Sequence, residues 1–164
     1  SFLKGFGSGN ISAYMHPSGT LFIGGTDRGW GARGGKRFAI DRVIWKNKVP
    51  FEIHEMRAKP DGFELTFTHE VDAKTASDLK SYSMSAYTYI YQSKYGSPVV
   101  DKLNPEILGA EVTGPKTVRV TVDKLTKGHV HELQAKGVRS LDNKPILHPI
   151  GYYTLNEIPP AEVN

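Results

Sequence analysis

The sequence contains no cysteine among its 164 residues. Disulfide bonds, thiolate metal sites, a cysteine nucleophile and CxxCH haem attachment are therefore excluded within this chain. Long apolar runs are also missing, so neither a membrane span nor a signal peptide is predicted. Because the chain opens on Ser1 rather than Met, we expect a fragment or a processed piece, and the missing signal says little about secretion.

A strong charge of one sign is absent as well. The chain has 21 basic and 17 acidic residues, a formal net charge of +4 and an isoelectric point near 9.2. Dedicated nucleic-acid binders gather Lys and Arg on one face or in one run, and only Lys4 and the stretch 28–37 hint at this here. We expect no nucleic-acid partner.

The sequence predicts a β-hairpin most clearly in residues 51–68. Apolar and polar residues alternate over 51–56, as in a strand with one buried face. The turn signal Lys59-Pro60-Asp61-Gly62 follows, and Asp-Gly supplies a residue that tolerates positive φ. The alternation then resumes, with Phe63, Leu65 and Phe67 on one face.

A second hairpin of the same design spans 106–122, with its turn at Gly114-Pro115-Lys116. From Pro50 onward the sequence predicts seven strands, at 51–58, 63–68, 82–91, 107–113, 117–122, 130–138 and 151–156. A single helical turn is expected at 71–78, with Asp72 as its N-cap. Seven short strands in about a hundred residues are typical of an immunoglobulin-like or fibronectin-III-like sandwich.

The first 48 residues differ in kind, since ten of the 17 glycines lie at or before position 35. Strands are predicted at 10–15, 20–25 and 38–45, and three short strands cannot bury a core alone. We therefore predict an all-β chain in three parts. A Gly-rich antiparallel sheet occupies 1–48, the sandwich occupies 49–158, and 159–164 is a tail or linker.

A glycine-rich loop at 26–36 is the first candidate binding site. No helix pattern follows it, which argues against a phosphate-binding loop. Its polar and aromatic residues suit sugars or carboxylates, because an indole covers a pyranose face and Arg forms a bidentate fork. In the alternative interpretation Trp30 and Trp45 are packing anchors and the charges face solvent. The candidate ligand-binding residues in this loop are Asp27, Arg28, Trp30 and Arg33.

The tyrosines of the predicted strand 82–91 form a second candidate. Tyr87, Tyr89 and Tyr91 fall on one face at period two. Such a row is either a carbohydrate platform or protein interface, or a surface that covers a neighbouring module. The second interpretation is preferred, because residues 1–48 need a neighbour.

His129 and His131 form an HxH pair, and positions i and i+2 of a strand share one face. They are weak candidates for a metal site, because no third ligand is adjacent in sequence. The alternative is an exposed pair at the start of a strand, alternating with a buried Val130 and Leu133. No metal is assigned to the chain.

No catalytic constellation emerges from the sequence. Ser, His and Asp occur, but there is no nucleophile elbow, HExxH motif or close carboxylate pair. We assign no catalytic residue and no cofactor to this chain.

The stretch from Gly24 to Asp72, the segments 81–101 and 148–159 together resemble the C-terminal portion of bacterial glucose/sorbosone-dehydrogenase-like β-propeller proteins. These are membrane-bound or periplasmic proteins that often carry c-type haem domains. The resemblance implies that 16–30 belongs to a closing propeller blade and that an Ig-like module follows Pro50. It also implies a periplasmic or extracellular location.

The resemblance implies that a parent protein oxidises a sugar or alcohol with a quinone or haem c as acceptor. The leading hypothesis is a non-catalytic structural or interaction module that contacts other domains of that parent, or polysaccharide. Two alternatives stay open. One is a carbohydrate-binding module, and the other is a loop that donates Asp27, Arg28 and Trp30 to the parent's active site.

Overall fold

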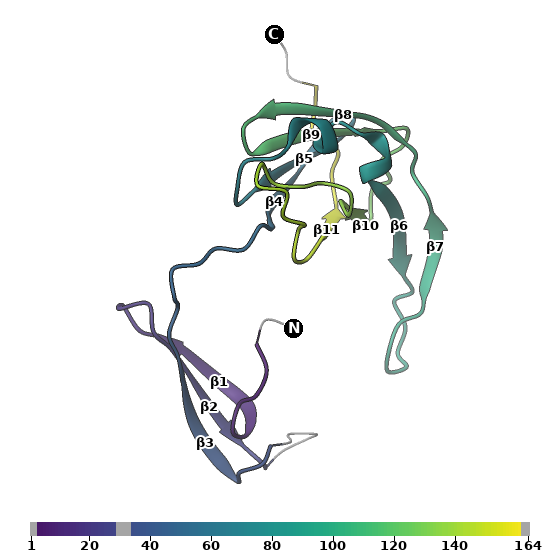
Figure 1. The fold of residues 1–164 in the computed structure, drawn as a ribbon. Helices are drawn as coiled ribbons and strands as arrows, with labels where there is room; N and C mark the ends of the chain where they lie inside the picture. Colours follow the sequence, from purple (N-terminus) through teal and green to yellow (C-terminus); the bar gives the residue numbers. More distant parts are fainter. Residues whose placement is uncertain (1–2, 29–33, 162–164) are drawn as a thin grey trace. The chain divides into compact units, whose positions relative to one another are not determined.

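The computed structural model describes residues 3–28 and 34–161. The chain divides into two compact units, residues 1–48 and residues 49–164. Three antiparallel sheets make up almost all of the regular structure, which confirms the predicted all-β class (Figure 1). Across the described residues, no helix has both the length and the apolar character needed to cross a membrane.

The first unit is a three-stranded sheet in the order β1-β2-β3. Its strands are β1 (Gly9–Met15), β2 (Leu21–Thr26) and β3 (Phe38–Val43), close to the predicted positions. Ile23 of the central strand is buried, whereas Phe38 and Ile40 on β3 are largely exposed. As the sequence predicts, these strands alone do not enclose a core.

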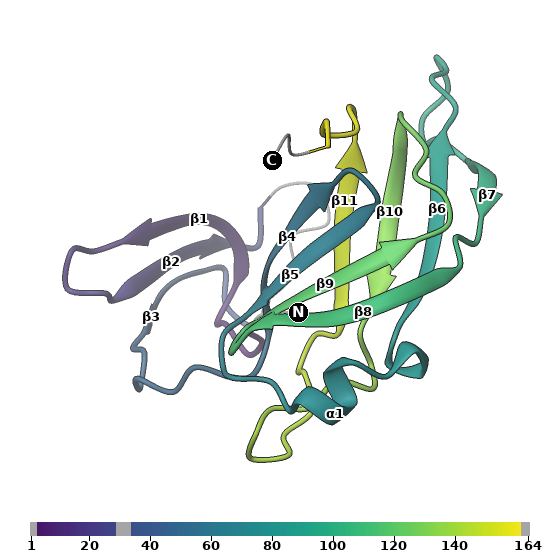
Figure 2. The same cartoon turned by 90° about the horizontal axis from the view of Figure 1, so that it is seen from above.

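The second unit is a sandwich of two four-stranded sheets, with strand orders β4-β5-β9-β8 and β11-β10-β6-β7 (Figure 2). The first sheet comprises β4 (Ile53–Lys59), β5 (Gly62–Phe67), β9 (Thr117–Val122) and β8 (Ile107–Gly114). The second comprises β11 (Ile150–Leu155), β10 (His129–Gln134), β6 (Ser83–Tyr89) and β7 (Val99–Leu103). This arrangement matches the immunoglobulin plan with one extra edge strand.

A short helical connection joins the two sheets between β5 and β6. It consists of α1 (Ala73–Ala76) and the 3₁₀ turn η1 (Leu79–Ser81). Asp72 caps α1 as predicted, because its carboxylate accepts the amide hydrogen of Thr75 at 2.9 Å. The Tyr82 hydroxyl donates to the Ala76 carbonyl at 2.7 Å, which fixes the end of this connection beneath the core.

The core lies between the inner faces of the two sheets. Phe63, Leu65 and Phe67 of β5 are buried, which confirms the face predicted from their spacing. Val118 and Val120 of β9 extend the same layer, and Leu133 of β10 lies in the layer of the other sheet. Burying a side chain of this size stabilises the fold by about 1.5–3 kcal/mol.

Both predicted hairpins form, but their turns work differently from the expectation. Each has a two-residue loop, Pro60-Asp61 between β4 and β5 and Pro115-Lys116 between β8 and β9. Neither Asp61 nor Gly62 adopts positive φ. Gly62 is needed for another reason, since a Cβ at this position would overlap the carbonyl oxygen of Val120 on β9.

Within the sandwich, one strand was not predicted and the ends of two others were misplaced. β7 was not predicted, so the sandwich has eight strands rather than seven. β7 is a short edge strand with a bulge opposite β6, and this breaks the alternation on which the prediction rested. β6 ends at Tyr89 rather than at residue 91, and β10 ends at Gln134 rather than at residue 138.

Gly62→Ala should destabilise the sandwich by roughly 2–3 kcal/mol, because the added methyl group meets backbone that cannot move aside. Gly109→Ala is a matched control. Both glycines pair with Thr121 of β9, yet a Cβ at Gly109 finds its nearest neighbour at 3.5 Å, an ordinary contact. Urea unfolding would measure both variants. Equal losses would show that strand glycine as such, rather than the close approach to Val120, sets the cost.

Candidate functional site

The outer face of the sheet β11-β10-β6-β7 carries the tyrosines singled out from the sequence. Tyr87 lies opposite Val130 of β10 and is half-buried, whereas Tyr89 is half-exposed. The two rings meet edge to face, with centroids 5.7 Å apart. Partial burial, and then the interaction with Tyr89, raises the pKa of Tyr87.

A further tyrosine joins this face from β11. Tyr152 lies opposite Glu132 of β10 and is exposed. We call Tyr87, Tyr89, Tyr152, Val130 and Glu132 the tyrosine face. Sequence reasoning missed Tyr152 because only strand pairing brings β11 beside β10.

Tyr91 does not belong to the tyrosine face. It follows the end of β6 and is fully exposed, as is Tyr95, in the connection that leads to β7. Figure 2 shows this connection extending past the neighbouring strands of the sheet. The expected row of three rings is therefore a pair on the strand, with the third ring on a projecting hairpin.

The glycine-rich loop connects β2 and β3, and only part of it lies among the described residues. Asp27 and Arg28 are exposed, and the Asp27 carboxylate lies 3.8 Å from the Arg37 guanidinium. Trp30 and Arg33 lie outside the described residues. Trp45, expected as a packing anchor, is instead mostly exposed. The ligand-binding role of this loop stays a prediction.

The HxH pair is oriented opposite to the expected exposed pair. His129 and His131 are both buried, on the inner face that also holds Leu133, whereas Val130 points outward. The register of β10 against β6, with His131 opposite the buried Ala86, fixes this orientation. The two rings do not converge on a metal, and the described residues contain no group of three or more potential metal ligands.

His131 is a neutral core histidine. Its Nδ1 lies 3.3 Å from the carbonyl of His129, and its Nε2 accepts the Thr126 amide hydrogen at 3.4 Å. Its ring packs on Phe63 at a centroid distance of 5.4 Å. Burial lowers the pKa of His131, the hydrogen bond to the His129 carbonyl opposes this, and the His129 ring lowers the pKa further.

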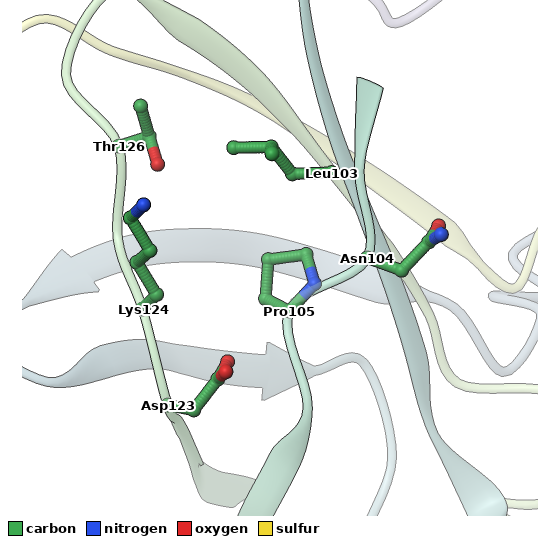
Figure 3. A pocket seen from close by; sticks show the side chains of 6 residues that line it. All are labelled: Leu103, Asn104, Pro105, Asp123, Lys124 and Thr126. Carbon is green, nitrogen blue, oxygen red and sulfur yellow. The ribbon is translucent and has the colours of Figure 1, made fainter. Parts of the chain in front are cut away.

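A small cavity of about 150 Å³ lies at the end of the sandwich near Thr126 (Figure 3). Leu103 and Pro105 form one wall, and Asp123 and Lys124 form the other. The Asp123 carboxylate already accepts the Glu106 amide hydrogen at 2.7 Å, so it ties two loops together. The Asp123 carboxylate in the cavity wall therefore has a structural role.

A shallow groove of about 440 Å³ runs between β4 and β11 on another side of the sandwich. Glu52 accepts two hydrogen bonds from His148 at its rim, one from the amide at 2.8 Å and one involving Nδ1 at 2.6 Å. The groove floor forms where Gly151 lets Met56 approach closely. These contacts join the two sheets along their shared edge.

Comparison with known proteins identifies solved structures that share this fold. No protein family and no curated protein matches the sequence. Three solved structures share its fold, each with a TM-score of 0.50: the N-terminal part of the bacterial S-layer protein SbsC, its fragment 31–844, and its domains 1–6. Sequence identity is 19% to the first and 21% to the other two. At this level of identity, the structural similarity shows a shared fold alone.

The alignments cover 66% of this chain for the first structure and 69% for the other two. They cover 24% of the first structure's own chain and 14% of the others. The chain therefore spans a quarter or less of the proteins whose fold it shares.

These findings correct the resemblance to glucose/sorbosone-dehydrogenase-like propellers. The structural neighbours are S-layer protein fragments, and the described strands form three open sheets with no propeller. The interpretation as a piece of a sugar or alcohol dehydrogenase was wrong, and neither alternative, a carbohydrate-binding module or an active-site loop, gains support. Antiparallel strands separated by glycine-containing turns occur in many β folds. The segments that carried the resemblance were therefore not specific to one family.

The low pKa of His131 gives the sandwich a stability loss on mild acidification. An unfolded imidazole takes up a proton near pH 6.5, whereas folded His131 resists it. The contribution of His131 to the free energy of unfolding should be constant well above this pH and fall below it, by at most about 1.4 kcal/mol per pH unit. Chemical unfolding between pH 5 and 8 would measure the slope.

His131→Leu is the matched variant for this test, because it keeps an apolar side chain against Phe63 and removes the titrating ring. The difference between the two curves should be constant above pH 7 and change below pH 6.5, where only the unmodified chain loses stability through this ring. Asp142 does not affect the measurement in this pH range. Hydrogen bonds from Lys144 and then from Ser140 lower its pKa to about 2, so its contribution to the free energy of unfolding is lost only below about pH 4. Parallel curves for the two proteins would contradict a neutral, buried His131.

Proposed function

We propose that this chain is a structural module of a larger bacterial cell-surface protein, in which the Ig-like sandwich separates and links the parts on either side of it. One observation carries the proposal: the chain enters and leaves the sandwich at opposite ends. The contacts of β4 with β11 establish this geometry.

β4 and β11 run side by side in the same direction. The Leu147 amide donates to the Phe51 carbonyl at 3.0 Å, so the start of the sandwich lies beside the residues that precede β11. Farther along, Gly151 lies against Met56. β11 then continues to Leu155, and the chain leaves at the far end of the sheet (Figure 2).

A domain with its two ends at opposite poles suits a linear array of domains, because pulling on the chain loads the sandwich along its length. The core of residues 49–161 is complete within the unit, which suits independent folding. The shared fold with S-layer protein SbsC supports a place at the cell surface.

A labelling experiment tests the location. Antibodies raised against residues 49–161 should bind intact cells of the source organism, and mild protease treatment of those cells should remove the signal. An antibody against a cytoplasmic protein is the control for lysis. Labelling that appears only after permeabilisation would overturn the proposed surface location.

A mechanical experiment tests the linking role. Residues 49–161, placed in a polyprotein and stretched from both ends, should unfold in one step that lengthens the chain by roughly 35–40 nm. Gly62→Ala should keep the step length and lower the unfolding force, because the destabilised strand lies in the loaded sheet. Gradual extension without a force peak would show that the sandwich bears no load.

A further inference from the structure

The edge strand β7 contains an unusual backbone conformation at Asp101. Asp101 adopts a φ of 50°, which is uncommon for a residue other than glycine. It lies in the bulge of β7, where two residues of β7, Asp101 and Lys102, face only Tyr87 of β6. The bulge turns the Asp101 carboxylate toward His129, which lies on β10, beyond β6.

The ring of His129 has an acceptor at each nitrogen. Its Nε2 lies 2.9 Å from Oδ2 of Asp101, and its Nδ1 lies 3.1 Å from the carbonyl oxygen of Lys127. A carbonyl oxygen and a carboxylate both accept hydrogen bonds, so satisfying both requires a proton on each ring nitrogen. The observed arrangement therefore fits the imidazolium, and the neutral ring can make only one of the two bonds.

The surroundings leave Asp101 as the counter-charge. The side chain of His129 is only 8% exposed, whereas that of Asp101 is 62% exposed. His131 shares the inner face but is neutral. The Lys127 ammonium points elsewhere, to Glu157 at 2.7 Å. Asp123 and Lys124 line the cavity beside Thr126, where the Asp123 carboxylate accepts the Glu106 amide hydrogen.

We propose that His129 and Asp101 form a protonation-dependent clamp that holds the edge strand β7, and with it the projecting hairpin that bears Tyr91 and Tyr95, to the rest of the sheet. With the proton in place, a charged hydrogen bond crosses β6 and fixes the bulge. Without the proton, one bond is lost and β7 keeps only its pairing with β6. Loss of the proton therefore loosens the hairpin, and its uptake tightens it.

Hydrogen exchange of the full chain tests the clamp. Protection factors, corrected for the intrinsic effect of pH, would be measured for the amides of β7 and β9 at pH 6.0 and pH 8.5. The ratio of β7 to β9 protection should fall about five-fold or more at the higher pH, since bonds to charged groups are stronger than neutral ones. β9 reports global stability, including any change due to His131.

Two variants separate the clamp from other causes. Asp101→Asn keeps a residue that tolerates positive φ and removes the charge, so the pH effect on β7 should shrink. His129→Gln removes the titrating ring, so the effect should disappear. A ratio that is independent of pH in the unmodified chain would overturn the proposal. An effect that persists undiminished in Asp101→Asn, which is exposed and should fold even where His129→Gln does not, would also overturn it.

Discussion

The sandwich depends on the contact of Phe63 with the opposite sheet. Its ring packs on His131 of β10 and on Tyr153 of β11, at centroid distances of 5.4 and 5.6 Å. At the start of the same strand, Gly62 lets β5 approach the backbone of β9. Burial in this packing lowers the pKa of His131, so the contact that closes the core also disfavours a proton on a histidine inside it.

Two histidines on one strand face therefore serve different purposes. His131 is fully buried in the core, whereas His129 lies two residues nearer the end of the strand and reaches a partly exposed carboxylate. The separation of two residues places them on the same face, and depth alone separates their environments. Two histidines of an HxH pattern can therefore share one face of a strand without binding one metal ion, because one of them lies at the end of the sandwich and the other in its core.

Local sequence patterns were enough to predict the parts of this fold that depend on neighbours in the chain. Hairpins 51–68 and 106–122, the cap at Asp72 and the inner face of Phe63, Leu65 and Phe67 all rest on such patterns. Features set by pairing between distant strands could not be predicted. These include the bulged strand β7, the inward direction of His129 and His131, and the place of Tyr152 opposite Glu132 of β10. Turn chemistry was also ambiguous, since Asp61-Gly62 signals positive φ but Gly62 is present for space.

The two units are stabilised by different interactions. Residues 1–48 carry eight basic and two acidic residues, a charge of +6, whereas residues 49–164 carry 13 and 15, a charge of −2. In the first unit, backbone bonds and polar contacts such as Gly7 N to the Asp41 carboxylate at 3.0 Å hold the sheet, while Phe38 and Ile40 stay exposed. Hydrogen bonds alone contribute little net stability, because water offers the unfolded chain the same partners. The three strands therefore need apolar cover from outside their own sheet, whereas the sandwich, with its core enclosed, does not.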